Sequence, residues 1–178
     1  MARDRLPGRF AIALAVFHSL SLIACFASIV AAAISANQNK KAAVVTIGAF
    51  VAAFWTIGED VAEIAALADT QRKCVRRCPA QWLYLLELVT AIFCFALPAA
   101  SMLAYEEARY QRCRYVPHRD EEKFDCKSSS GPMDTPWMAS LGAIYLAATI
   151  HSILFVMNTA LYCIKRRKAR SVAQEEKA

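Results

Sequence analysis

Long apolar runs alternate with polar segments four times along this chain. Each run exceeds the roughly 20 residues that a helix needs to cross a bilayer. The first run is also longer than the apolar core of a signal peptide, which is about 7–15 residues, so we expect it to be retained. The pattern predicts an all-α fold, an integral membrane four-helix bundle within residues 1–164, with spans at 10–35, 42–68, 82–105 and 137–164.

The polar segments between these spans differ in length. Residues 36–41 are short, so the first two spans form an antiparallel hairpin, whereas 106–136 form a long loop. The tail, 165–178, is basic and has few apolar positions, which predicts disorder. Small residues recur at the four-residue spacing that lets helices pack closely, at Gly48 and Ala52 and at Ala96, Ala100 and Ala104.

Basic residues are distributed unevenly between the two sides of the predicted membrane domain. The amino end, the loop 69–81 and the tail lie on one side and carry 13 of the 21 Lys and Arg residues. Because basic residues near span ends stay inside, both termini are predicted to be cytoplasmic. This predicts a multi-pass protein of the plasma membrane or of a secretory-pathway membrane.

The net charge of +6 does not indicate nucleic-acid binding, because the excess flanks apolar runs. A cluster directly after the last span is expected to attract anionic cytoplasmic lipids, at about 1 kcal/mol per residue. It consists of Lys165, Arg166, Arg167, Lys168 and Arg170.

Cysteine positions gain meaning from this orientation. Cys113 and Cys126 share the extracytoplasmic loop, and we predict a disulfide between them that constrains the loop by about 3 kcal/mol. Three others lie beside the membrane on the cytoplasmic side and are candidates for reversible acylation: Cys74, Cys78 and Cys163.

Ionisable and amide side chains interrupt all four spans. On insertion scales, a charged residue at the centre of a membrane helix costs about 2.5–3.5 kcal/mol. At about 1.5 Å of rise per residue, these side chains lie about 8–13 Å from the cytoplasmic span ends. The predicted intramembrane polar network consists of His18, Glu59, Asp60, Glu63, Glu87 and Asn158. His151 is deeper, but it shares a helix face with Asn158.

Two interpretations of the acids Glu59, Asp60 and Glu63 remain open. In the first, they face the inside of the bundle and bind a cation or proton, or pair with a partner's basic residue. In the second, the span leaves the hydrocarbon near Trp55, and the acids lie on a hydrated helix end. The second is favoured, because residues 42–58 already suffice to cross.

No catalytic, cofactor or metal motif is present in the sequence. His18 and His151 are isolated on apolar helices, and no serine, histidine and acid set has a spacing typical of a catalytic site. We therefore predict a non-enzymatic protein without a cofactor or metal ligands.

Several loop and span features resemble the MARVEL-type tetraspan family, particularly its small fungal members. They are the short first loop, Glu87 within residues 85–93, the pair Cys113 and Cys126, and residues 153–158 with the basic tail. The resemblance implies a role in membrane apposition, vesicle trafficking or lateral domain organisation, without catalysis.

The expected function is therefore organisation of membrane domains, trafficking or partner proteins through helix packing and lipid contacts. The expected partners are the lipid bilayer with its anionic cytoplasmic lipids, and a second copy or another membrane protein, but not nucleic acid. The alternative is a small cation- or proton-conducting protein, or a channel accessory subunit. It would use Glu59, Asp60, Glu63 and Glu87.

Overall fold

Within the residues that the structure describes, the fold consists of four long helices and one β-hairpin. The computed structural model describes residues 8–38, 42–68, 80–110, 114–118, 121–125 and 135–175. The helices are α1 (Gly8–Gln38), α2 (Ala42–Ala68), α3 (Ala80–Tyr110) and α4 (Thr135–Glu175). The strands β1 (Arg114–His118) and β2 (Glu121–Asp125) pair antiparallel.

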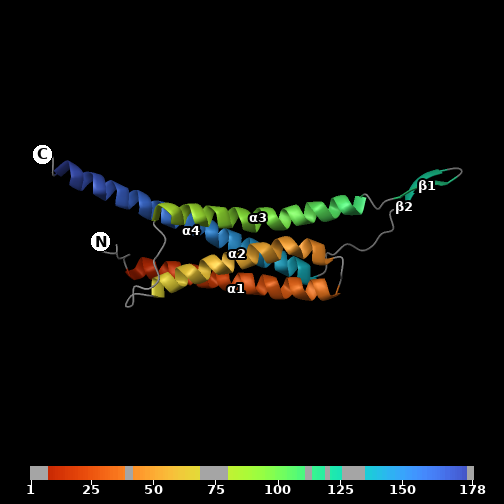
Figure 1. The fold of residues 1–178 in the computed structure, drawn as a ribbon, viewed down its shortest axis with the longest axis horizontal. Coiled ribbons are helices and arrows are strands. Elements are labelled where there is room, and N and C mark those ends of the chain that lie inside the picture. The colour runs from red at the N-terminus through yellow and green to blue at the C-terminus, as the bar shows by residue number, and fades with distance from the viewer. Residues whose placement is uncertain are drawn as a thin grey trace.

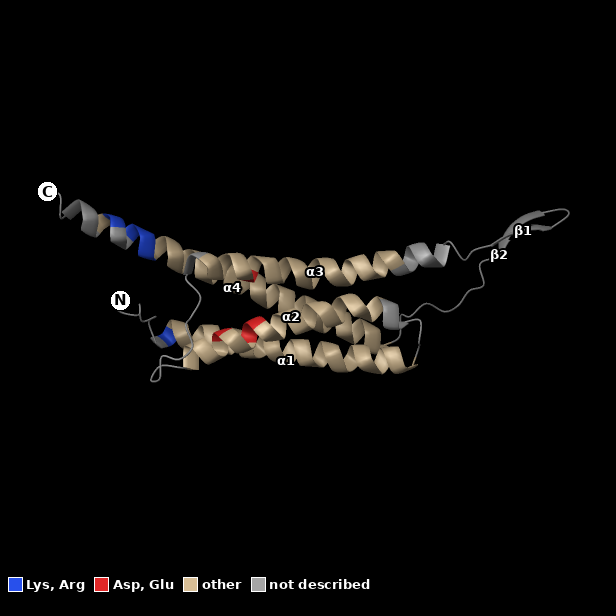
Figure 2. Cartoon of the chain, viewed as in Figure 1, with Lys and Arg blue, Asp and Glu red and all other residues tan. Residues whose placement is uncertain are grey.

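The four helices form one bundle (Figure 1). Each helix packs along the next one in the chain, and α4 packs back against α1, which leaves α1 and α3 on one diagonal. The start of α1 and the end of α4 lie at the same end of the bundle (Figure 1). We call this the basic end, because Arg9 and the basic cluster of α4 lie there, and the acids lie in the half of the bundle nearest to it (Figure 2).

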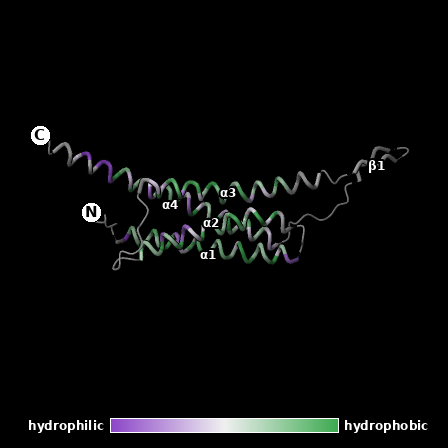
Figure 3. Tube along the Cα trace, in the orientation of Figure 1, coloured by the Kyte–Doolittle hydropathy of each residue, from purple (hydrophilic) through white to green (hydrophobic). Residues whose placement is uncertain are grey.

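The outer surface of the bundle is apolar, and its interior is partly polar. Large apolar side chains such as Ile12, Phe54 and Val156 are more than 60% exposed, and the helices are hydrophobic over most of their length (Figure 3). This reverses the pattern of a soluble bundle and matches one surrounded by lipid. All four helices are long and apolar enough to cross a membrane, which indicates a multi-pass membrane protein.

Small side chains fill the middle of the bundle and bring the helices close together. Ala24, Cys25, Ala52, Ala53, Cys94, Ile144, Ala147 and Ala148 form one buried cluster. Gly48 and Ala52 are buried, as their spacing predicts, whereas Ala96, Ala100 and Ala104 are exposed on α3. Their stripe faces outward because α3 buries a different face, which carries Glu87, Cys94 and Pro98.

Two segments differ from the sequence predictions. Residues 165–175 continue α4 as a helix instead of starting a disordered tail, because this segment contains no Gly or Pro and is rich in helix formers. The predicted long loop contains the hairpin of β1 and β2, in which Arg114 pairs with Asp125. This pair joins the residue after Cys113 to the residue before Cys126, although both cysteines lie outside the described residues, as do Cys74 and Cys78.

Candidate functional site

Each helix contributes one fully buried ionisable side chain to a single site. His18 from α1, Asp60 from α2, Glu87 from α3 and His151 from α4 are all 0% exposed. On α1, positions 14, 18, 21, 25, 28, 32 and 35 are buried, with the alternating three- and four-residue spacing of a bundle seam, and Ala24 is buried next to Cys25. His18 therefore points inward for the same reason that Leu14 and Cys25 do. We call these four ionisable residues the quartet.

The quartet is a closed ring in which imidazoles and carboxylates alternate. His18 Nδ1 lies 2.8 Å from Asp60 Oδ1, and His151 Nδ1 lies 2.6 Å from Glu87 Oε2. Longer contacts join these two pairs: His18 Nε2 is 3.5 Å from Glu87 Oε1, and His151 Nε2 is 3.6 Å from Asp60 Oδ1. The ring therefore consists of two tight pairs held side by side.

Apolar clusters lie on both sides of the quartet along the bundle axis. Toward the basic end, Leu14, Ile150 and Leu154 form a buried cluster. Toward the other end lies the small-residue cluster that includes Cys25 and Ala148. Because the ring lies between them, its charges interact in a medium of low dielectric constant, where unpaired charge is costly.

Glu59 adds a third carboxylate beside the quartet. Thr90 Oγ1 donates a hydrogen bond to Glu59 Oε2, and Trp55 Nε1 donates to the same Thr90 oxygen at 2.9 Å. Glu59 Oε1 and Asp60 Oδ2 are buried and have no hydrogen-bond partner. Two carboxylate oxygens in the site are therefore available for a further ligand.

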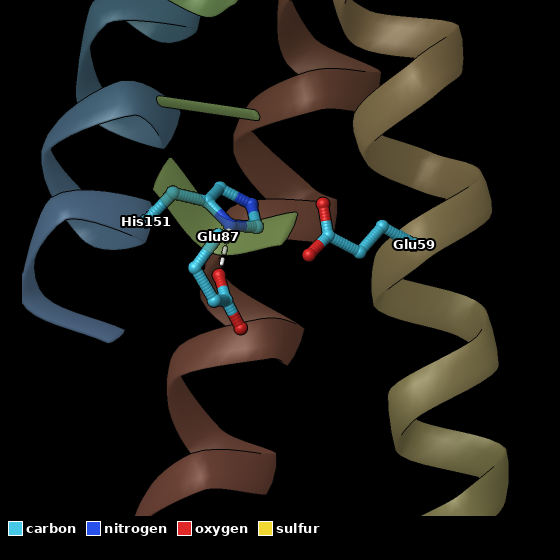
Figure 4. Close-up of side chains that lie close together, drawn as sticks. All are labelled: Glu59, Glu87 and His151. Atoms are coloured by element: carbon cyan, nitrogen blue, oxygen red, sulfur yellow. Dashed lines mark hydrogen bonds and ion pairs between the residues drawn. The ribbon is translucent and has the colours of Figure 1, made fainter. Parts of the chain in front are cut away.

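Three side chains from different helices converge on one point (Figure 4). Glu59, Glu87 and His151 each offer one ligand atom, and these atoms lie within 4.8 Å of one another. Figure 4 shows the Glu59 carboxylate directed toward the hydrogen-bonded pair of Glu87 and His151. This group can hold a metal ion. It is a ligand set that no short-range spacing in the sequence shows.

Buried polar side chains continue from the quartet toward both ends of the bundle. Toward the basic end, Asn158 Nδ2 donates to Glu87 Oε1 at 3.4 Å, and Glu63 is 4% exposed one helical turn beyond Glu59. Toward the other end, Ser21 Oγ lies 3.0 Å from His151 Nε2, and Ser28 Oγ bonds to the hydroxyl and the carbonyl of Ser140.

The structure brings His18, Glu59, Asp60, Glu87 and Asn158 of the predicted network into contact, and Glu63 lies next to them. The acids of α2 are buried at 0–8% exposure, so they do not lie on a solvent-exposed helix end. The favoured interpretation differs from the structure because Leu67 of α2 packs against the cluster of Leu14, Ile150 and Leu154 on α1 and α4. The buried face of α2 therefore extends past Trp55.

Sequence reasoning left two central residues out of the network, His151 and Thr90. His151 and Asn158 are seven residues apart, so both lie on one helix face. This spacing could have placed His151 in the predicted network. Thr90 had a comparable signal, because it lies one turn after Glu87 on α3. Depths counted from the span ends place His151 far from Glu87. This counting assumes that all four spans end at the same level in the membrane.

Other predicted sites lie apart from the quartet. Cys163 is an exposed free thiol on α4, and Cys25 and Cys94 are buried free thiols within the bundle. Lys165, Arg166, Arg167, Lys168 and Arg170 lie on the helical extension of α4. Acylation of Cys163 remains a prediction.

Comparison with family models, curated proteins and solved structures found no match to this chain, so the resemblance to MARVEL-type tetraspans also remains a prediction.

Proposed function

We propose that this protein conducts cations or protons across a membrane through the interior of its helix bundle. The observation that carries the proposal is the quartet, in which every helix buries one ionisable side chain against the others. Intramembrane ionisable residues that pair with one another inside a bundle are typical of ion and proton pathways.

Helix association alone does not account for the quartet. At about 2.5–3.5 kcal/mol per charged residue, Asp60 and Glu87 together cost about 5–7 kcal/mol on insertion. Interhelical hydrogen bonds in membranes return about 0.6 kcal/mol each, or about 1.2 kcal/mol for the two hydrogen bonds of the ring. The difference disfavours a purely structural role, because apolar packing would stabilise the same bundle at lower cost.

The charge balance of the site supports binding of positive charge. Three carboxylates, from Glu59, Asp60 and Glu87, surround two imidazoles, so the fully ionised site has a net charge of −1. Among the side chains that the structure describes, Lys and Arg occur only at the two helix ends of the basic end. Protons or a metal cation therefore have to compensate the remaining charge in this low-dielectric interior.

A column of buried polar groups supports conduction rather than storage. Glu63 and Asn158 extend the site toward the basic end, while Ser21, Ser28 and Ser140 extend it toward the opposite end. Ser21 and Ser28 are two helical turns apart on one face of α1, about 10 Å along the axis. Water molecules or small side-chain movements would have to bridge these steps.

Flux across liposomes tests the proposal. The purified full-length chain, reconstituted with a trapped pH dye or cation indicator, is expected to pass protons or cations under an imposed potential. Asp60→Asn and Glu87→Gln are expected to reduce that flux by at least tenfold, because each removes a charge from the ring while keeping its shape.

The matched control is Thr149→Val. Thr149 lies two residues from His151 on α4, but it is exposed and bonds to its own helix at Tyr145 O. Flux should remain within twofold of wild type in this variant. Equal flux in wild type, Asp60→Asn and Glu87→Gln would exclude the quartet from the pathway.

A second candidate function is organisation of the membrane through anionic lipids, and one observation favours it. α4 extends as a helix to Glu175, and Arg166, Arg167 and Arg170 are exposed on this extension. A rigid basic helix next to the bundle would gather anionic lipid around the protein, and lateral domains or partner proteins could assemble on that lipid.

Removal of the three charges tests this second function. Replacing Arg166, Arg167 and Arg170 by Gln is expected to weaken phosphatidylserine binding by up to about 100-fold, since each contributes about 1 kcal/mol. Native mass spectrometry of protein from mixed-lipid nanodiscs measures the retained lipid. Replacement of the same residues by Lys keeps the charge and should preserve binding. Equal loss in both variants would mean that charge is not the cause.

A further inference from the structure

We infer that Glu59, Glu87 and His151 bind a divalent first-row transition-metal ion. The inference rests on the proposed cation-handling function and specifies its substrate class. The three ligands come from α2, α3 and α4, and they meet beside the quartet (Figure 4).

The separations of the ligand atoms approach those of a metal site. Zinc binds nitrogen at about 2.0–2.1 Å and carboxylate oxygen at about 2.0–2.2 Å, so two ligand atoms of a tetrahedral site lie about 3.3–3.5 Å apart. The three candidate atoms lie within 4.8 Å of one another. Side-chain rotations that change these separations by about 1 Å would complete the site.

An unpartnered oxygen points to a missing ligand at this position. Glu59 is 8% exposed, and its Oε1 has no hydrogen-bond partner, whereas Oε2 accepts from Thr90. A buried carboxylate oxygen without a donor is costly. Because the Glu59 carboxylate faces Glu87 and His151 in Figure 4, a cation bound between them would satisfy it.

His151 is oriented as a metal ligand requires. Its Nδ1 faces Glu87 Oε2 at 2.6 Å, and its Nε2 lies 3.0 Å from Ser21 Oγ. A metal ion bound at Nδ1 would replace the hydrogen bond that this nitrogen makes with Glu87. Nε2–H then donates to Ser21 Oγ, and this hydrogen bond fixes the ring orientation, as polar partners of metal-bound imidazoles usually do.

The donor set selects the class of ion. One imidazole and two carboxylates suit Zn²⁺, Fe²⁺, Co²⁺ or Mn²⁺, whereas Ca²⁺ prefers six to eight oxygen ligands. Three protein ligands also leave a coordination position open, whereas structural zinc sites are almost always closed by four protein ligands. An ion that enters and leaves is what a conduction pathway requires.

Equilibrium binding to the purified full-length chain in nanodiscs tests the inference. Titration with Zn²⁺ is expected to give one site per chain, and Ca²⁺ at a hundredfold excess should not compete. Co²⁺, used as a spectroscopic probe, should give visible absorption bands that Zn²⁺ abolishes. Failure of wild type to bind one Zn²⁺ per chain would overturn the inference.

Glu59→Gln and Ser21→Ala test the assignment of the site. Glu59→Gln keeps the hydrogen bond with Thr90 and is expected to weaken Zn²⁺ binding by at least tenfold. Ser21→Ala, which removes only the hydroxyl beside His151, should weaken it by about 10–100-fold and alter the Co²⁺ spectrum. Equal affinity in wild type and both variants would overturn the inference.

Ser19→Ala is the matched control for Ser21→Ala, because it removes the same hydroxyl from the same helix two residues away. Ser19 is exposed and donates to Ala15 O of its own helix. Its Zn²⁺ affinity should remain within threefold of wild type, and equal weakening in Ser19→Ala and Ser21→Ala would overturn the assignment of the site.

Binding and flux separate this inference from the proposed function. Zn²⁺ binding without any flux would refute conduction and leave the metal site standing. Proton flux without Zn²⁺ binding would refute the metal site and leave conduction standing.

Discussion

Replacing Asp60 alone by Val is expected to destabilise the bundle by about 3–5 kcal/mol. The substitution leaves the buried His18 without the Asp60 oxygen that lies 2.8 Å from it. Removing one partner of a buried ionisable pair typically costs this amount. His18→Leu is expected to cost a similar amount, because it leaves Asp60 buried without its close hydrogen-bond partner. Unfolding by SDS in mixed lipid–detergent micelles, followed by circular dichroism, measures the free energy of unfolding.

Removing both members of the pair should restore stability. The double variant His18→Leu with Asp60→Val is expected to unfold within about 1 kcal/mol of wild type or above it, because apolar replacement of a buried ion pair is often neutral or stabilising. The tight pair of His151 and Glu87 remains intact in this variant. Flux should nevertheless be lost, which separates the functional role of the pair from its structural cost.

A second double variant also replaces one histidine and one acid, but the pair that remains has a longer contact. His18→Leu with Glu87→Leu leaves Asp60 facing His151 across the longer contact of 3.6 Å. It should therefore be less stable than the first double variant by about 1 kcal/mol or more. Single variants that match wild type in stability would contradict the coupling that the ring geometry predicts.

Gly48→Ala is expected to destabilise the bundle by about 3 kcal/mol, at the upper end of the range for overpacking. A Cβ at this position would lie 2.2 Å from the carbonyl oxygen of Leu97 and 2.6 Å from Ser101 Oγ. Since the carbonyl belongs to the backbone, α3 itself must move away from α2. This movement would also break the hydrogen bond from Ser101 Oγ to Val45 O at 2.9 Å.

Gly142→Ala is the matched control for Gly48→Ala. A Cβ on Gly142 of α4 meets no atom within 4 Å. Its stability should equal that of wild type or increase slightly, because Ala favours the helix over Gly. The same unfolding assay applies to both variants. If Gly48→Ala and Gly142→Ala were equally stable, α2 and α3 would not pack closely at Gly48.

The amino-acid sequence was sufficient to predict the number of helices and their approximate bounds. The predicted spans match the four helices to within a few residues at most ends, because a membrane helix is identified by the summed hydrophobicity of consecutive residues. The close packing at Gly48 and Ala52 was also readable, since small residues one turn apart share a face. The exposed stripe from Ala96 to Ala104 has the same spacing, so spacing does not identify the buried face.

The sequence was not sufficient to predict how neighbouring helices are offset along the bundle axis. Counting residues from the cytoplasmic span ends places Glu87 about 8 Å and His151 about 20 Å deep, yet their side chains lie 2.6 Å apart. The estimate failed because hydropathy marks where a span ends in sequence but not how far neighbouring helices slide along each other. Packing of the small buried residues fixes that offset.

The candidate site was likewise only partly predictable from the sequence. Local pattern was sufficient to identify four apolar helices and to locate acids, histidines and an amide inside them. The pairing of His18 with Asp60 and of His151 with Glu87 joins residues 42 and 64 positions apart. Such contacts depend on the rotation and offset of whole helices. Folding therefore buries all three acids of α2: Asp60 joins the quartet, Glu59 lies beside it and Glu63 lies one turn away. Glu59 and Asp60 each keep one oxygen without a hydrogen-bond partner.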